Sequence, residues 1–111
     1  MKLSLKTALA CSLALACMAA RADDAAFTAK LEMTDGKLNP ARIEVPAGKR
    51  IRIEVSNTGK GAAEFESVEL RKEKVLAPGA SSVVVIAPQQ PGEYKFFDDF
   101  HQSARGVLVV K

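Results

Sequence analysis

The sequence predicts an all-β domain, either a β-sandwich or a Greek-key barrel. Three observations predict it: short segments of alternating apolar and polar residues, Gly/Pro turn signals between them, and no strong helical periodicity. Several short strands separated by such turns are typical of these two architectures. The chain has 111 residues, enough for one domain, and shows no repeat or linker.

The first half of the domain contains four candidate strands. Residues 27–33 alternate apolar Phe, Ala, Leu and Met with polar Thr, Lys and Glu, as in a strand buried on one face. A short strand at 43–45 stops at a Pro-Ala-Gly turn. Residues 51–55 alternate most regularly, and the strand ends at Asn-Thr-Gly-Lys-Gly. Residues 63–67 follow as a weaker candidate.

The second half contains three more. Residues 68–76 are charged and receive no assignment, and a Pro-Gly turn then leads into the valine-rich segment 81–87. An aromatic-rich strand at 93–100 and a closing strand at 106–110 complete the domain. The alternation predicts a core formed by apolar residues of all these strands except 63–67: Phe27, Leu31, Ile43, Val45, Ile51, Ile53, Val55, Val83, Val85, Tyr94, Phe96, Val107 and Val109.

Residues 1–22 have the features of a secretory signal peptide. Two lysines precede an apolar run over residues 9–20, and Ala-Arg-Ala at 20–22 fits the small-x-small cleavage pattern. The run is too short to span a bilayer. We therefore expect residues 23–111 to be exported as a periplasmic domain that does not itself span the membrane.

The basic charge of the chain belongs to this signal. Lys2, Lys6 and Arg21 account for the formal net charge of +3, so residues 23–111 carry no formal net charge. This balance gives no basis for nucleic acid as a partner. The chain's two cysteines also lie in the signal, so the mature domain has neither a disulfide nor a thiolate ligand.

A carboxylate stands in the core-facing row of the aromatic strand. Tyr94, Phe96, Asp98 and Phe100 share one face of the strand 93–100. A buried carboxylate is costly unless a metal, a cation or several N–H donors compensate its charge. His101 follows three residues later, with Asp99 between. The alternative is that both aspartates belong to a solvated turn and the histidine to an exposed loop.

Two more carboxylates share a face of the segment 63–67. Glu64 and Glu66 lie on one side of an extended chain and Phe65 on the other. Like charges on one face repel unless a cation lies between them. The alternative is a solvated edge strand whose glutamates pair with the basic residues of the segment 71–74.

If the two stretches converge, they supply several carboxylates and one imidazole. That donor set suits Cu(II), Fe, Mn or Zn. It does not suit a blue-copper centre, which needs a thiolate. Met33 offers a soft ligand, although its place in a strand favours a core position.

The segment from Tyr94 to His101, followed by the closing strand, resembles the last two strands of a cupredoxin. In that family the strand ends in a cysteine ligand and a histidine ligand follows three residues later. Asp98 stands at the cysteine position, His101 matches the histidine, and the first histidine ligand falls near Glu64. Residues 104–105, Ala-Arg, occupy the region of the usual methionine. The turns at 45–49, 77–79 and 91–94 also match. The resemblance implies a cupredoxin-like Greek-key β-sandwich with a carboxylate–histidine metal site at one end.

The acidic motifs at 64–67 and 96–101, and the charged segment 70–75, more narrowly resemble small periplasmic cupredoxin-like proteins of bacterial ferrous-iron uptake systems (the Ftr and Efe types). Those systems pair the protein with an iron permease, and its proposed role is copper-assisted oxidation of Fe(II) to Fe(III). The resemblance therefore implies copper as cofactor, iron as substrate ion and an iron permease as partner. The metal-binding residues it implies are Glu64, Glu66, Asp98, Asp99 and His101. The alternatives are a non-catalytic copper or iron carrier and a redox-silent interaction module.

Overall fold

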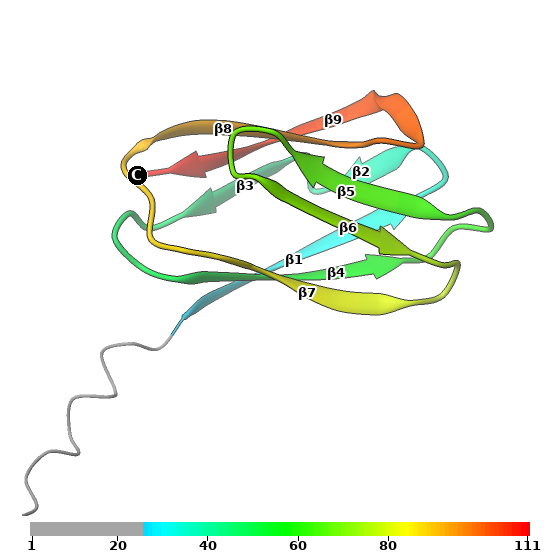
Figure 1. Cartoon of the computed structure of the whole chain (residues 1–111), viewed down its shortest axis with the longest axis horizontal. Helices are drawn as coiled ribbons and strands as arrows, with labels where there is room; N and C mark the ends of the chain where they lie inside the picture. The colour runs from blue at the N-terminus through cyan, green and yellow to red at the C-terminus, as the bar shows by residue number, and fades with distance from the viewer. Residues whose placement is uncertain (1–25) are drawn as a thin grey trace, which may run out of the picture.

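The structure is a computed structural model that describes residues 26–111, which form a sandwich of two β-sheets (Figure 1). This part of the chain contains nine strands, two more than the sequence predicts, and it contains no helix, as expected for an all-β domain. The strands are β1 (Phe27–Thr34), β2 (Lys37–Asn39), β3 (Arg42–Val45), β4 (Ile51–Asn57), β5 (Ala63–Ser67), β6 (Lys72–Leu76), β7 (Ser81–Ile86), β8 (Gly92–Asp98) and β9 (His101–Val110). Within residues 26–111 no helix is long and apolar enough to cross a membrane. The predicted signal peptide lies outside the described residues.

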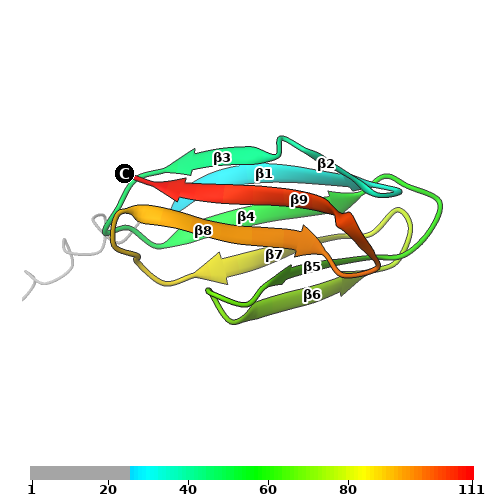
Figure 2. The same cartoon turned by 90° about the horizontal axis from the view of Figure 1, so that it is seen from above.

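Each sheet combines strands from distant parts of the chain. One sheet has the order β2-β1-β4-β7 and the other the order β3-β9-β8-β5-β6. β1 pairs with β4, and β3 with β9, in parallel, whereas the other pairs are antiparallel. Figure 2 shows β8 and β9 of the five-stranded sheet lying over β1 and β4 of the other. This order places β5 beside the end of β8, where the candidate site residues lie.

The core lies between the two sheets and contains inward-facing side chains from both. The rings of Phe65 and Phe96 stack there with centroids 5.4 Å apart. Met33 is fully buried among these apolar residues, so it is a core residue. The other fully buried apolar side chains are Leu31, Ile51, Ile53, Val55, Leu76, Ile86, Leu108 and Val110.

The predicted core is wrong at several positions. Val85 is 42% exposed, and the buried residues of β7 are Val84 and Ile86. A run of valines contains no polar residue that would indicate which face of the strand is buried. The register in which β7 pairs with β4 determines the buried face. Phe27, the first residue of β1, is also exposed. In β9, Val107 is only partly buried and Leu108 is a core residue.

Two strand boundaries also differ from the prediction. The charged segment left unassigned contains β6, which is held by antiparallel pairing along the whole length of β5. β9 begins at His101 rather than at Gly106, because the chain turns directly after Asp98 and pairs back along β8. His101 is therefore the first residue of a strand. Phe100, predicted in the row of Tyr94 and Phe96, lies in the turn and is exposed.

Two polar side chains hold the loops at the site end of the sandwich. The buried Asn57 amide donates to the carbonyl oxygens of Gly61 (2.9 Å) and Leu76 (3.0 Å), and its oxygen accepts from the Gly59 N–H. The Asp35 carboxylate, in the β1–β2 turn, accepts from the N–H groups of Lys60 and Gly61. These bonds fix the loop that leads into β5, and so they fix where β5 begins.

Candidate metal site

The five candidate residues lie at one end of the five-stranded sheet. Glu64 and Glu66 are on β5, Asp98 ends β8, Asp99 lies in the β8–β9 turn and His101 begins β9. The structure brings the two acidic stretches together, since β5 and β8 are neighbours and Phe65 pairs with Asp98. It also divides the five residues into two groups on different sides of the sheet.

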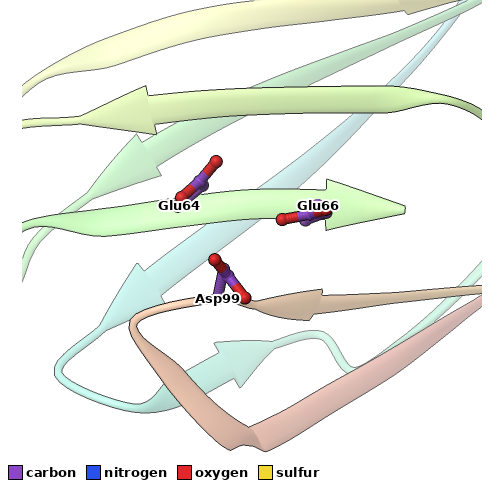
Figure 3. Close-up of side chains that lie close together, drawn as sticks. All are labelled: Glu64, Glu66 and Asp99. Carbon is purple, nitrogen blue, oxygen red and sulfur yellow. The ribbon is translucent and has the colours of Figure 1, made fainter. Parts of the chain in front are cut away.

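The first group is a carboxylate cluster on the outer face of the sheet, formed by Glu64, Glu66 and Asp99. Each of the three offers an oxygen within 4.8 Å of the others, and each side chain is partly buried. Figure 3 shows Asp99 pointing toward β5 from the end of β8. The period-two prediction for β5 is confirmed, because Phe65 points into the core on the opposite face.

The electrostatics of the carboxylate cluster favour a cation. The pKa of Glu64 is raised, first by loss of hydration and then by the charges of Asp99, Glu73, Glu66 and Asp98. Loss of hydration and the charges of Asp99 and Glu73 also raise the pKa of Glu66. Both glutamates hold their protons more tightly than free glutamate does, because each loses hydration and ionises beside other anions. A bound cation would relieve that repulsion.

Glu73 is an acidic neighbour that the sequence prediction missed. It lies on β6 directly opposite Glu66, and directly paired residues project from the same face of a sheet. Glu73 belongs to the charged segment 68–76, for which no strand was predicted. Had β6 been predicted as the partner of β5, the alternation would have placed Glu73 beside the cluster.

The second group is the pair of Asp98 and His101. Asp98 is only 1% exposed, which confirms its predicted core-facing position. Its Oδ1 accepts hydrogen bonds from the N–H groups of Glu64 and Phe100, both at 3.0 Å. Its Oδ2 lies 3.0 Å from Nδ1 of His101. N–H donors of the chain itself therefore compensate the buried carboxylate.

His101 is held at its ring but remains open to solvent. Its side chain is 38% exposed. The ring lies over Gly36 of the β1–β2 turn, where an added Cβ would reach within 3.5 Å of its carbons. The single histidine of the chain therefore sits between a buried carboxylate and the open end of the sandwich.

The donors at this end do not fit a blue-copper centre. Asp98 stands where the resemblance expects the cysteine ligand. Ala104, which is buried, and Arg105, which lies over the Phe97 ring, stand in the region of the expected methionine. Cys11 and Cys17 lie outside the described residues. Carboxylate and imidazole donors remain, and they fit Cu(II), Fe, Mn or Zn.

Comparisons with known proteins give one family. The sequence matches the cupredoxin-like domain family over residues 7–110, so the match begins inside the predicted signal peptide. The chain is also similar to an uncharacterised protein of Rickettsia prowazekii (strain Madrid E). The two are 36% identical over 91 residues, which cover 81% of this chain and 73% of that protein.

Three solved structures illustrate the shared fold. A purple cupredoxin from Nitrosopumilus maritimus has a TM-score of 0.59 and 18% identity, covering 75% of this chain and 99% of its own. Reduced auracyanin from Roseiflexus castenholzii has a TM-score of 0.66 and 16% identity, and the match covers 78% of this chain and 98% of auracyanin. A third structure is the metal-binding domain of the Cu(I)-exporting P-type ATPase of Streptococcus pneumoniae, solved with Cu(I). It has a TM-score of 0.66 and 16% identity, and the match covers 79% of this chain and 97% of that domain. At these identities the likeness shows the fold alone.

Proposed function

This chain belongs to the cupredoxin-like domain family, and we propose that it is a periplasmic metal-binding protein of ferrous-iron uptake. In this role it binds copper and iron and assists the oxidation of Fe(II) to Fe(III) before a permease transports the iron. The observation that carries the proposal is the carboxylate cluster, whose three oxygens lie within 4.8 Å of one another beside the Asp98–His101 pair. The narrower resemblance to iron-uptake proteins supports the choice of iron.

The carboxylate cluster is the candidate position for iron, which is the substrate ion. Glu64, Glu66 and Asp99 offer only hard oxygen donors. Such donors stabilise Fe(III) more than Fe(II), because the smaller and more highly charged ion gains more from anionic oxygen. A site of this kind makes the loss of an electron from iron easier.

The Asp98–His101 pair is the candidate position for copper. The imidazole of His101 suits Cu(II), and the pair lies next to the cluster: the Glu64 N–H donates to Oδ1 of Asp98 at 3.0 Å. Copper bound there would supply a one-electron acceptor. The contribution of the chain is to hold the imidazole and the carboxylates in fixed positions on β5, β8, the β8–β9 turn and β9.

An anaerobic Fe(II) oxidation assay tests this function. The protein is loaded with one equivalent of Cu(II), Fe(II) is added, and the loss of Fe(II) is followed with a colorimetric chelator. Each Fe(II) oxidised reduces one Cu(II), so no oxygen is needed. We expect faster oxidation than with the same amount of free Cu(II), and slower oxidation after Glu66→Gln.

Glu32→Gln is the matched control, because it removes the same charge from an exposed position on β1 of the other sheet. It should leave the rate unchanged. A rate no higher than that of free copper contradicts the oxidation proposal. Stoichiometric binding of both metals without oxidation would identify the protein as a carrier, and undetectable binding would leave an interaction module.

A further inference from the structure

The hydrogen bonds around Asp98 determine which nitrogen of His101 is free. Both carboxylate oxygens are engaged: Oδ1 by two backbone N–H groups and Oδ2 by the imidazole. An ionised carboxylate only accepts hydrogen bonds, so Nδ1 of His101 must carry the proton. In the neutral ring the lone pair is then on Nε2. We propose that Asp98 is a positioning residue that holds His101 in the Nδ1–H tautomer, with Nε2 as the nitrogen that binds metal.

The burial of the pair supports this arrangement. Asp98 is 1% exposed whereas the His101 side chain is 38% exposed, so the carboxylate lies inside and the ring extends outward. Within residues 26–111 no group hydrogen-bonds Nε2. Metal-binding histidines commonly donate their second ring N–H to a carboxylate, which fixes the ring and makes the ligating nitrogen more basic.

The backbone links this pair to the carboxylate cluster. The Glu64 N–H donates to Asp98 and the Asp99 N–H donates to the Glu64 carbonyl oxygen. The residue that orients the imidazole is therefore bonded to the main chain of a cluster residue. A shift of Asp98 would move the imidazole relative to the cluster, so the carboxylate sets the spacing between the two metal positions.

Asp98→Asn reverses the polarity of the bond without changing the shape of the side chain. The amide oxygen can still accept from Glu64 and Phe100, and the amide NH₂ then faces Nδ1 of His101. Because that NH₂ is a donor, Nδ1 must accept and the proton moves to Nε2. The lone pair needed for metal binding is lost from Nε2. We expect metal affinity at the imidazole to fall by about 10- to 100-fold.

Nitrogen-15 NMR of the imidazole reads the tautomer directly, because the chain has one histidine. Spectra are recorded on the metal-free protein at a pH above the imidazole titration. We expect the Nδ1–H form in the wild type and the Nε2–H form in Asp98→Asn. Asp35→Asn is the matched control: it also removes a charge that acts on His101, but its carboxylate bonds to backbone N–H groups of the β4–β5 loop. It should keep the Nδ1–H form.

The same spectra are then recorded on the wild type with Zn(II), a diamagnetic ion that binds the same donors. They show which nitrogen binds the metal. A coordination shift at Nε2 with Nδ1–H retained supports the proposal. A coordination shift at Nδ1 overturns it, because the ion would then lie between the imidazole and Asp98. If the metal-free wild type shows the Nε2–H tautomer, that spectrum alone overturns the proposal.

The metal experiment rests on the proposed function, whereas the tautomer experiment does not. If neither nitrogen responds to saturating Zn(II), the proposed metal position at His101 fails and the tautomer still decides the role of Asp98. A misfolded Asp98→Asn protein leaves the two wild-type measurements to decide the proposal.

Discussion

Replacing Asp98 with alanine should destabilise the metal-free protein substantially. The carboxylate accepts three hydrogen bonds, each of 3.0 Å, from the N–H groups of Glu64 and Phe100 and from the His101 ring. A hydrogen bond to a charged group contributes about 1.5–3 kcal/mol. Water can replace part of this near the half-exposed turn, so we expect a total loss of about 3 kcal/mol.

Thermal unfolding followed by circular dichroism measures this loss. For a domain of this size, about 3 kcal/mol corresponds to a decrease in Tm of about 12–24 °C. Asp98→Asn keeps the Oδ1 acceptor and should lose only about 1 kcal/mol. Glu32→Ala is the control, since its side chain is exposed on β1 of the other sheet; it should change stability by less than about 0.5 kcal/mol.

The reasoning is refuted if Asp98→Ala unfolds within about 0.5 kcal/mol of the wild type. That result would mean that the two N–H groups find other partners at no cost. A protein that folds only after metal is added would also refute it, because the structure satisfies this carboxylate with donors from the chain alone.

Three further predictions concern Glu64, Gly106 and Asn57. Glu64→Gln should raise the Tm of the metal-free protein at neutral pH by about 1–5 °C, because it removes repulsion between like charges. Since the folded-state pKa of Glu64 is raised, wild-type stability should increase as the pH falls through that pKa, and the variant should lose this slope in a pH series of unfolding curves. Gly106→Ala should cost about 1–3 kcal/mol in urea unfolding, because an added Cβ would lie 2.5 Å from the Phe96 ring. Asn57→Ala should cost about 2–3 kcal/mol by the same assay, because it leaves two carbonyl oxygens without their donor.

Period-two alternation predicted the site geometry wherever a polar residue marked one face of a strand. Glu64 and Glu66 lie opposite Phe65, and Asp98 follows Phe96 in the buried row, as expected. The alternation failed in β7, where consecutive valines carry no such mark and the prediction chose the wrong face. The sequence therefore predicted which carboxylates share a face but could not predict every strand.

The compensation of Asp98 could not be predicted from residue types. Two of its three donors are backbone N–H groups, from Glu64 on the next strand and Phe100 in the following turn. Every residue except proline has such a group, so no pattern of side chains reveals it. Long-range strand pairing also determined that Glu73 lies beside the cluster, which the charged sequence around it did not indicate.

The most direct test of the account is a Cu(II) titration of the protein followed by EPR, with His101→Ala measured alongside. The account predicts tight stoichiometric binding, nitrogen hyperfine structure from one imidazole, and loss of that structure with weaker binding in the variant. Unchanged spectra in His101→Ala, or no binding in competition with the buffer, would contradict a copper position at the Asp98–His101 pair.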